Sequence, residues 1–393
     1  MSKAVIVSAA RTAIGTFGGA LTNTKATDLG GMAVKEALVR SGLEAGSVDE
    51  VILGNVLSTN LGLNPARVAA IKGGVPKETP SFGVNKACGS GLKAVALAAQ
   101  AIGCGEAELI IAGGMENMSM TPYVLPKARF GYRMGPDQII DSMLADGISC
   151  PITNVHMGIT AENIAEKYGI SREAQDEFAA ASQIKAGAAQ VSGAFDEEIF
   201  GVELVQKKGD PIVFDKDEHP RPETSAEKLG KLRPAFKKDG TVTAGNASGV
   251  NDGAAAVVVM SADRAKAEGR EPLATIRGAA SAGVDPSLMG MGPWPASCKA
   301  LERCDLKVED IDLWELNEAF AAQSLGVLSE LKIDSAKVNV NGGAIALGHP
   351  IGASGTRVLV TLLYAMKRRG ATLGLASLCI GGGQGIAMVV ERV

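Results

Sequence analysis

Two cysteines and one histidine of this chain, each set among glycines, have the types and spacing needed to make and break thioesters. Cys88 lies within residues 85–91, directly before a run typical of a helix, while His349 and Cys379 lie about thirty residues apart near the C-terminal end. One thiol can act as a nucleophile, the imidazole as its proton acceptor and the second thiol as a separate acid or base. The chain has only three histidines and six cysteines, so this combination is informative and points to acyl transfer.

The setting of Cys88 favours an activated thiol. A free thiol with a pKa of ~8.5 is only slightly ionised at neutral pH. A helix N-terminus, however, directs unpaired N–H groups and a partial positive charge toward a residue placed there. Gly89 and Gly91 permit a sharp turn and the close approach of a substrate to the backbone. The alternative is a small inert core cysteine, which is the commoner fate of this residue type.

His349 and Cys379 occupy two further glycine-rich loops. His349 follows Gly348 in a loop that leads to a second expected helix N-terminus at 352–355, where an imidazole can accept the thiol proton. Cys379 follows the expected buried strand 373–378 and precedes three glycines, whose backbone N–H groups can bind a developing oxyanion. Taken singly, a loop histidine is more often a surface residue, and a cysteine at a strand end is equally well a buried structural one.

Asn317 and the other cysteines carry weaker signals. Asn317 begins an expected helix after a strand at 311–313, and taken alone it is best interpreted as the N-cap of that helix. Its functional alternative is to hold a water or the imidazole in an oxyanion site. The remaining thiols lack the paired spacing and neighbouring histidines of a zinc site, so no metal is expected; they are Cys104, Cys150, Cys298 and Cys304.

The bulk composition restricts the class of protein. At 393 residues the chain exceeds the usual size of one hydrophobic core, so two or more domains are expected. A hydrophobic fraction of 46% with 21% charged residues is ordinary for a soluble protein, and a net charge of −4 argues against nucleic-acid binding. We expect no membrane span and no signal peptide. Six scattered cysteines fit a reducing compartment, which predicts a cytoplasmic location.

The hydrophobic pattern predicts an α/β protein with an insertion. Strand and helix signals alternate over the first 120 residues, which favours a mainly parallel sheet covered by helices. The residue composition changes between 121 and 247, where proline and charged residues cluster. Two helices are expected within this stretch, at 160–168 and 172–190, and Ser171 is the expected cap of the second. A strand at 254–260 then resumes the earlier alternation.

Two offsets suggest that the alternating unit is duplicated. A shift of 264 residues places Ser90-Gly91 on Ser354-Gly355 and lays the strand near 109 over the strand near 373. A shift of 260 lays 48–53 over 308–313. Chance matching of generic α/β patterns is the alternative.

The motifs resemble those of one known family over essentially the whole chain. The matching segments are 85–94, 112–119, 156–158, 240–253, 317–324, 339–357 and 378–385. The chain resembles the thiolases, and within them the biosynthetic acetoacetyl-CoA thiolases. The resemblance implies a thiolase fold, in which duplicated βαβαβαββ halves form a five-layered αβαβα core. The N-terminal half would comprise 1–120 plus 248–270, the inserted CoA-binding loop domain 121–247, and the C-terminal half 271–393.

The resemblance also implies a reaction. Two acetyl-CoA molecules would condense to acetoacetyl-CoA and CoA, and the reverse thiolysis would use the same groups. Cys88 would be the nucleophile and acyl carrier, His349 its base, and Cys379 the acid/base that moves an α-proton. One oxyanion site would combine His349 with a water held by Asn317, and the other would use the backbone N–H groups of Cys88 and Gly381. The resemblance implies no metal and no organic cofactor.

Further residues would bind the substrate. The resemblance places Arg221 at the nucleotide phosphates, Phe236 near the adenine or pantetheine, and Ser248 at the pantetheine. Around the acyl group it places His156, Met157, Met289, Ala319 and Phe320. The residues themselves support this in part, because 215–238 carries seven lysines and arginines against five acids, although a solvated mixed-charge loop is the more common reading of such a segment.

Three related readings remain open. A degradative 3-ketoacyl-CoA thiolase would use the same groups on longer chains, and Leu63 and Trp294, which depart from the expected pattern, leave the chain-length preference undecided. A decarboxylating ketoacyl synthase would carry a histidine where Cys379 stands, and a non-catalytic lipid carrier would not need all three groups. By family analogy we expect a homotetramer, a dimer of dimers, with contacts around 121–135.

Overall fold

Two halves of the chain fold in the same order of strands and helices. The computed structural model describes residues 3–206 and 208–393. The elements of the N-terminal half are β1 (Ala4–Thr12), β2 (Gly15–Thr16), α1 (Ala26–Ser41), β3 (Glu50–Gly54), α2 (Pro65–Lys72), β4 (Ser81–Val84), α3 (Ser90–Cys104), β5 (Leu109–Asn117) and β13 (Asn251–Ser261). Leaving out the two-residue β2, this is the predicted βαβαβαββ order.

The C-terminal half repeats this order, except that one strand is reduced to a single bridge. After α7 (Ala262–Ala267) come β14 (Ala274–Gly283), α8 (Pro293–Arg303), β15 (Leu313–Leu316), α9 (Ala321–Leu331), α10 (Ala344–Leu347), α11 (Ile351–Arg369), β16 (Leu373–Ile380) and β17 (Gln384–Glu391). Where the first half has β4, this half has only an isolated parallel bridge between Trp314 and Val338.

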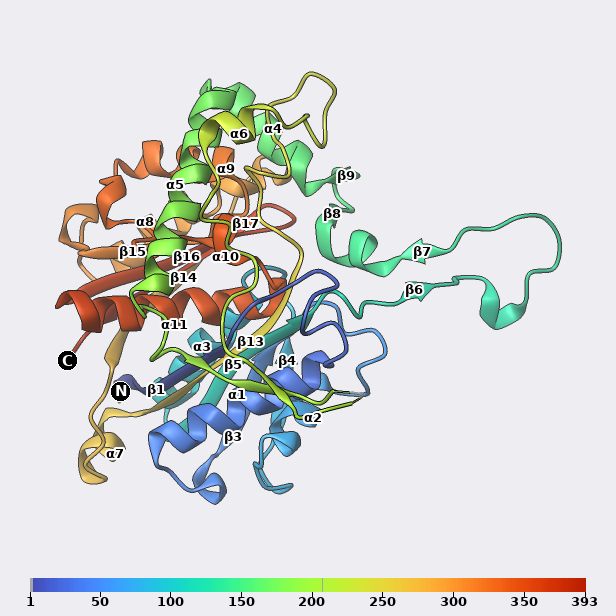
Figure 1. Cartoon of the computed structure of the whole chain (residues 1–393). Coiled ribbons are helices and arrows are strands. Elements are labelled where there is room, and N and C mark those ends of the chain that lie inside the picture. Colours follow the sequence, from blue (N-terminus) through green and yellow to red (C-terminus); the bar gives the residue numbers. More distant parts are fainter. Residues whose placement is uncertain (1–2, 207) are drawn as a thin grey trace.

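The strands form one continuous sheet that folds around two central helices. Its order is β15-β16-β17-β14-β1-β13-β5-β3-β4, and β1 and β14 join the two halves through two residue pairs. The helices α3 and α11 lie between the halves and share one apolar core with strands of both. Separate cores lie under α1 and α2 on one outer face and under α8 and α9 on the other (Figure 1). The five-layered thiolase fold is thus confirmed.

The two central helices cross at paired glycines, which explains the offset of 264. A Cβ atom on Gly91 would lie 2.8 Å from the Thr356 nitrogen, and one on Gly355 would collide with the Leu92 nitrogen. The two contacts are related by the same shift of 264 residues, as expected for a duplicated unit. Only glycine lets the backbones approach this closely.

The offset of 260 is wrong by three residues. The Asp49 carboxylate accepts hydrogen bonds from the backbone of Glu108 and Leu109, and Asp312 does the same for Thr372 and Leu373. These equivalent aspartates are 263 residues apart. The error arose because two short mixed apolar and acidic runs can be aligned in several registers, whereas contact with the neighbouring strand selects only one.

One stretch of the described residues, Ala87–Cys104, is long and apolar enough to cross a membrane by length and composition alone. We expected no such stretch from the sequence. Half of this stretch is buried, and most of it forms α3, which packs against α11 and strands of both halves. A core helix of this kind passes the same test, so the stretch is weak evidence for a span.

Between β5 and β13 the chain runs largely outside this sheet. The expected helices are present as α4 (Met157–Tyr168) and α5 (Arg172–Val191), and the Ser171 hydroxyl caps α5 by accepting from the Ala174 N–H at 3.2 Å. The short strands of this region were not predicted. The remaining elements are β6 (Tyr123–Val124), β7 (Ile140–Asp141), β8 (Ser149–Cys150), β9 (Val155–His156), β10 (Ile199–Phe200), β11 (Val202–Leu204), β12 (Ile212–Phe214) and α6 (Ala226–Gly230).

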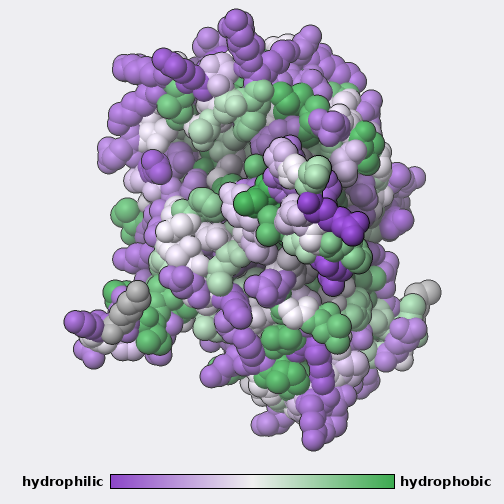
Figure 2. Space-filling view, turned by 90° about the vertical axis from the view of Figure 1, so that its right-hand side faces the viewer, coloured by the Kyte–Doolittle hydropathy of each residue, from purple (hydrophilic) through white to green (hydrophobic). Residues whose placement is uncertain are grey.

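The paired strands β6 and β7 begin an arm that projects from the body (Figure 1). Several of its apolar side chains are exposed, with Phe130 at 87% and Met134 at 98% of their free surface. Figure 2 faces the tip of this arm and shows hydrophobic side chains near the centre of that face. We call residues 120–140 the arm.

Candidate active site

Cys88 sits in a tight turn immediately before α3. Ala87 adopts a left-handed conformation with φ of 43°, which is uncommon for a residue with a Cβ atom. The Ser90 hydroxyl closes the turn by accepting from the Lys86 N–H at 2.8 Å and donating to the Ala87 carbonyl at 2.6 Å. The turn therefore presents the thiol at the N-terminus of a helix, as the glycine pattern predicted.

Burial dominates the protonation of this thiol. It raises the pKa of Cys88 to about 11, against hydrogen bonds from the N–H groups of Gly381 and of Cys88 itself, while the Glu116 charge adds to the rise. These N–H groups are the two that the sequence analysis assigned to an oxyanion site. The thiol is neutral at pH 7 and needs a proton acceptor before it can attack a thioester.

His349 is buried, and its contact with Ser354 determines which ring nitrogen carries the proton. Its Nδ1 lies 2.6 Å from the Ser354 hydroxyl, and that hydroxyl donates its only proton to the Pro350 carbonyl at 2.8 Å. Ser354 must then accept from the Nδ1–H, which leaves Nε2 with a lone pair. Burial, with a smaller effect of the Arg357 charge, lowers the pKa of His349 to about 3. The imidazole is thus a neutral proton acceptor.

Asn317 contacts the His349 imidazole and does not cap a helix. Its Nδ2 lies 3.4 Å from Nε2 of His349. The N-cap interpretation was wrong, because α9 begins only at Ala321 with Phe320 as its N-cap. The Asn317 Oδ1 is buried without a hydrogen-bond partner among the described residues, so it can accept a hydrogen bond from a water or a substrate group.

Cys379 lies near the end of β16 and is fully buried. Its pKa is raised, first by burial and then by the neighbouring Cys88. The effect of Cys88 on Cys379 indicates that the two thiols lie near each other, although 291 positions separate them in the chain. Among the buried residues, Cys379 shares an apolar cluster with Met289, Ala319 and Phe320.

Cys88 and His349 line an apolar cavity of about 320 Å³. The His156 ring stacks on Phe236 at 4.7 Å, and Phe236 meets the edge of Phe320 at 6.1 Å. His156 also caps α4, because its Nδ1 accepts from the Gly158 N–H at 3.0 Å. Ten predicted site residues line the cavity: Cys88, His156, Met157, Phe236, Ser248, Met289, Ala319, Phe320, His349 and Gly381.

Three predicted residues do not line the cavity: Cys379 and Asn317, which contact or pack against residues that do, and Arg221. The side chain of Arg221 is exposed, and its backbone N–H donates to Gln183 on α5 at 2.7 Å. It belongs to the segment 215–221, whose His219 packs on Gly249 of the cavity wall. Its suggested contact with the nucleotide phosphates stays a prediction.

Sequence reasoning missed two residues that support the site. One is Ser354. The other is Glu116 on β5, whose fully buried carboxylate accepts from the Asn55 side chain at 2.7 Å, the Gly352 N–H at 2.9 Å and the Val56 N–H at 3.0 Å. Burial raises the pKa of Glu116 to about 7. An acidic residue inside an otherwise apolar strand was the available signal, but its partners lie far along the chain.

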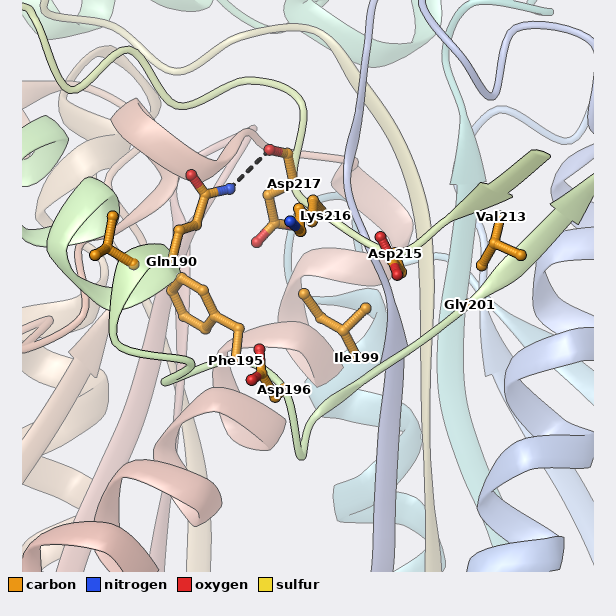
Figure 3. A pocket seen from close by; sticks show the side chains of 10 residues that line it. Gln190, Phe195, Asp196, Ile199, Gly201, Val213, Asp215, Lys216 and Asp217 are labelled. Carbon is orange, nitrogen blue, oxygen red and sulfur yellow. Dashed lines mark hydrogen bonds between the residues drawn. The ribbon is translucent and has the colours of Figure 1, made fainter.

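A larger cavity, of about 670 Å³, lies elsewhere (Figure 3). It opens between the end of α5 and the loop at 215–217, and Gln190 donates to the Asp217 carbonyl across it at 2.8 Å. The described residues that line it include no cysteine and no histidine. Because thioester chemistry needs those groups, we assign the active site to the smaller cavity.

Family comparisons agree with the fold. The thiolase N-terminal domain matches residues 4–263, and the thiolase C-terminal domain matches residues 270–392. The chain therefore belongs to the thiolase family.

Individual relatives match over the full length. The chain is 61% identical over 394 residues to an acetyl-CoA acetyltransferase of Escherichia coli and 59% identical over 392 residues to one of Cupriavidus necator, and each alignment covers 100% of both proteins. The crystal structure of the Bacillus anthracis acetyl-CoA acetyltransferase superposes with a TM-score of 0.98 at 48% identity, covering 100% of this chain and 99% of that one.

Proposed function

We propose that this protein is an acetyl-CoA C-acetyltransferase that condenses two acetyl-CoA molecules to acetoacetyl-CoA and CoA, and catalyses the reverse thiolysis. The observation that carries the proposal is that Cys88 and a neutral His349 line one apolar cavity, while the buried Cys379 lies near Cys88 and packs against residues of the cavity wall. The full-length relatives named acetyl-CoA acetyltransferase support the choice of substrate.

In the first half-reaction Cys88 attacks the thioester carbonyl of acetyl-CoA. His349 Nε2 takes the thiol proton as the carbon–sulfur bond forms, and the carbonyl oxygen becomes an oxyanion. The N–H groups directed at Cys88 can stabilise this charge. Collapse breaks the bond to the CoA sulfur, the departing thiolate takes the proton, and an acetyl group remains on Cys88.

In the second half-reaction Cys379 acts as the base. His349 Nε2 takes the proton of the neutral Cys379 thiol, and the resulting thiolate removes a proton from the methyl carbon of a second acetyl-CoA. The resulting carbanion attacks the acetyl group on Cys88. The enolate oxygen would lie against His349 and a water on Asn317, whose Oδ1 is free to accept. The new carbon–carbon bond forms as Cys88 leaves as thiolate, and this thiolate takes the proton held by His349. These steps use only protein groups and thioester activation, so they require no metal or organic cofactor.

The inserted segment 121–247 supplies the CoA-binding side of the site in this proposal. Phe236 lines the cavity beside Ser248, which directly follows the segment, and the exposed Arg221 is available for the nucleotide phosphates. We further propose a cytoplasmic location and a homotetramer in which the exposed apolar arm makes contacts between subunits.

Peptide mapping after incubation with acetyl-labelled acetyl-CoA tests the nucleophile and the reaction class together. We expect the label on the peptide that contains Cys88 and one equivalent of CoA released. Cys379→Ser should still be acetylated but should condense at least about 10³-fold more slowly, since it lacks the base. Label on a different residue, or acetylation that persists in Cys88→Ala, would rule out the proposed mechanism.

Substrate chain length separates the proposal from its nearest rival. Cleavage of acetoacetyl-CoA should be preferred over cleavage of 3-ketohexadecanoyl-CoA, as judged by kcat/KM. A preference for the long substrate would instead identify a degradative 3-ketoacyl-CoA thiolase that uses the same three groups.

A further inference from the structure

The backbone of His349 is held by a side chain of the other half. The fully buried Asn251, at the start of β13, accepts from the His349 N–H through Oδ1 at 2.9 Å. Its Nδ2 donates to the Gly15 carbonyl at 2.9 Å. Gly348 has a φ of 104°, and a Cβ atom there would lie within 2.6 Å of the Asn251 amide. The turn that carries the imidazole is therefore packed directly on Asn251.

A second histidine supports this asparagine from behind. Nδ1 of His219 lies 3.4 Å from Nδ2 of Asn251. The His219 ring also packs on Gly249, a residue of the cavity wall, where an added Cβ atom would lie 2.5 Å from Cε1 and 3.0 Å from Nε2. One imidazole thus touches both the wall of the cavity and the residue that holds His349.

The hydrogen-bond pattern determines the tautomer of His219. Asn251 must direct Oδ1 at the His349 N–H and Nδ2 at the Gly15 carbonyl, so its amide cannot be reversed without losing both bonds. Nδ1 of His219 therefore faces a donor and acts as an acceptor. Burial, with the Arg221 charge, lowers the pKa of His219 against an opposing effect of Glu218, which favours the neutral ring that this contact needs.

The segment around His219 is itself fixed at several points. Glu218 accepts from the Thr16 N–H at 2.8 Å, and the buried Asp217 forms an ion pair with Arg11 at 2.7 Å. On the other side, the Arg221 N–H is bonded to Gln183. His219 is therefore presented by a rigid segment, which lets a contact as long as 3.4 Å influence its neighbour.

We propose that His219 and Asn251 are positioning residues for His349, and that they link the segment carrying Arg221 to the turn that carries the catalytic base. The proposal rests on the proposed function. Neither residue touches the reacting atoms in this assignment. Asn251 sets where the imidazole lies relative to the Cys88 thiol, and His219 keeps the Asn251 amide in the orientation that His349 requires.

Two substitutions at one site separate positioning from packing. His219→Phe keeps a ring against Gly249 but removes the acceptor, whereas His219→Asn can place an amide oxygen near the position of Nδ1. In pre-steady-state acetylation of Cys88 by labelled acetyl-CoA, we expect His219→Phe to lower the maximal rate about fivefold, consistent with the loss of one hydrogen bond. The acetyl-CoA concentration at half-maximal rate should stay within about twofold, and His219→Asn should recover most of the rate.

The outcomes distinguish the two proposals. If the wild-type enzyme acetylates Cys88 and both variants react at its rate, the positioning role is refuted while the proposed function stands. Equal losses in both variants, or a loss confined to the concentration dependence, would also refute it, because packing or CoA binding would then explain the effect. If the wild-type enzyme does not acetylate Cys88, both proposals fall. Melting temperatures within about 2 °C of wild type would show that the variants are folded.

Discussion

Burial shifts the pKa values of Cys88 and His349, the two side chains proposed to react in the first half-reaction, in opposite directions. The pKa of Cys88 is raised to about 11 and that of His349 is lowered to about 3. Both shifts favour the uncharged form, so at pH 7 the pair is a thiol beside a neutral imidazole. Attack on acetyl-CoA must then include the proton transfer, which makes the placement of His349 decisive for the rate.

This protonation state predicts how Cys88 reacts with an alkylating agent that brings no proton acceptor. Only the thiolate reacts with iodoacetamide, and its fraction rises about tenfold per pH unit below a pKa of about 11. We therefore expect the alkylation rate of Cys88 to increase about a hundredfold from pH 7 to pH 9 without a plateau. Mass spectrometry of the Cys88 peptide measures this separately from the exposed Cys104 and Cys298. A plateau near pH 7 would show a preformed thiolate–imidazolium pair instead.

The residues proposed to react could be picked out from the sequence because their signals are local. Cys88 and Cys379 stand beside their own glycines, and the motif around each is contained in a few positions. Asn251 and Glu116 could not be found in this way, because they act on residues 98 and 236 positions away. Asn317 was misread for a related reason: its neighbours suggest a helix cap, and only the fold brings it to His349.

Elements were easier to predict than their registers. The strand and helix order follows from the hydrophobic pattern, which is a continuous buried run in β5 and a helical spacing in α3. The predicted offset between β3 and β15 was three residues too small, because short apolar runs do not specify a register until they pair with a neighbouring strand. The short strands between β5 and β13 were not predicted, since most of them have only two or three residues.

The crossing of α3 and α11 predicts a sharp difference between two glycines of one helix. A Cβ atom on Gly91 would lie 2.6 Å from the Thr356 hydroxyl and 2.8 Å from its backbone nitrogen. Relief requires the two helices to separate, and overpacking of this kind costs about 1–3 kcal/mol. Because Cys88 lies three residues before Gly91, we expect Gly91→Ala to lower both the melting temperature, by several degrees, and the acetylation rate.

Gly103 is the matched control for this prediction. It also lies in α3, but a Cβ atom there meets no atom within 4 Å. Gly103→Ala should leave the acetylation rate unchanged and stabilise the protein by up to about 1 kcal/mol through helix propensity. Calorimetry at a fixed scan rate compares the two variants. If Gly91→Ala is as stable and active as Gly103→Ala, close contact between the helices is not what requires glycine at 91.

At the scale of the whole molecule, the arm is the feature that a single chain leaves unexplained. Phe130 and Met134 keep 87% and 98% of their surface exposed, and the arm projects away from the body (Figure 1). Exposed apolar side chains gathered on a projecting segment are typical of an interface between subunits. If the arm joins two dimers, a charge placed on it should separate them without reaching the active site.

We therefore expect Phe130→Glu combined with Met134→Glu to reduce the mass measured by sedimentation equilibrium to half that of the wild-type assembly. Burying two carboxylates in an apolar contact costs several kcal/mol per site, which exceeds what a small interface supplies. Val191→Glu is the control, since Val191 is also 91% exposed but lies on α5, outside the arm. Acetylation of Cys88 should persist in the smaller species, because the described residues that line the cavity all lie outside the arm. An unchanged mass in the double variant, or an equal loss in Val191→Glu, would show that the arm does not hold the assembly together.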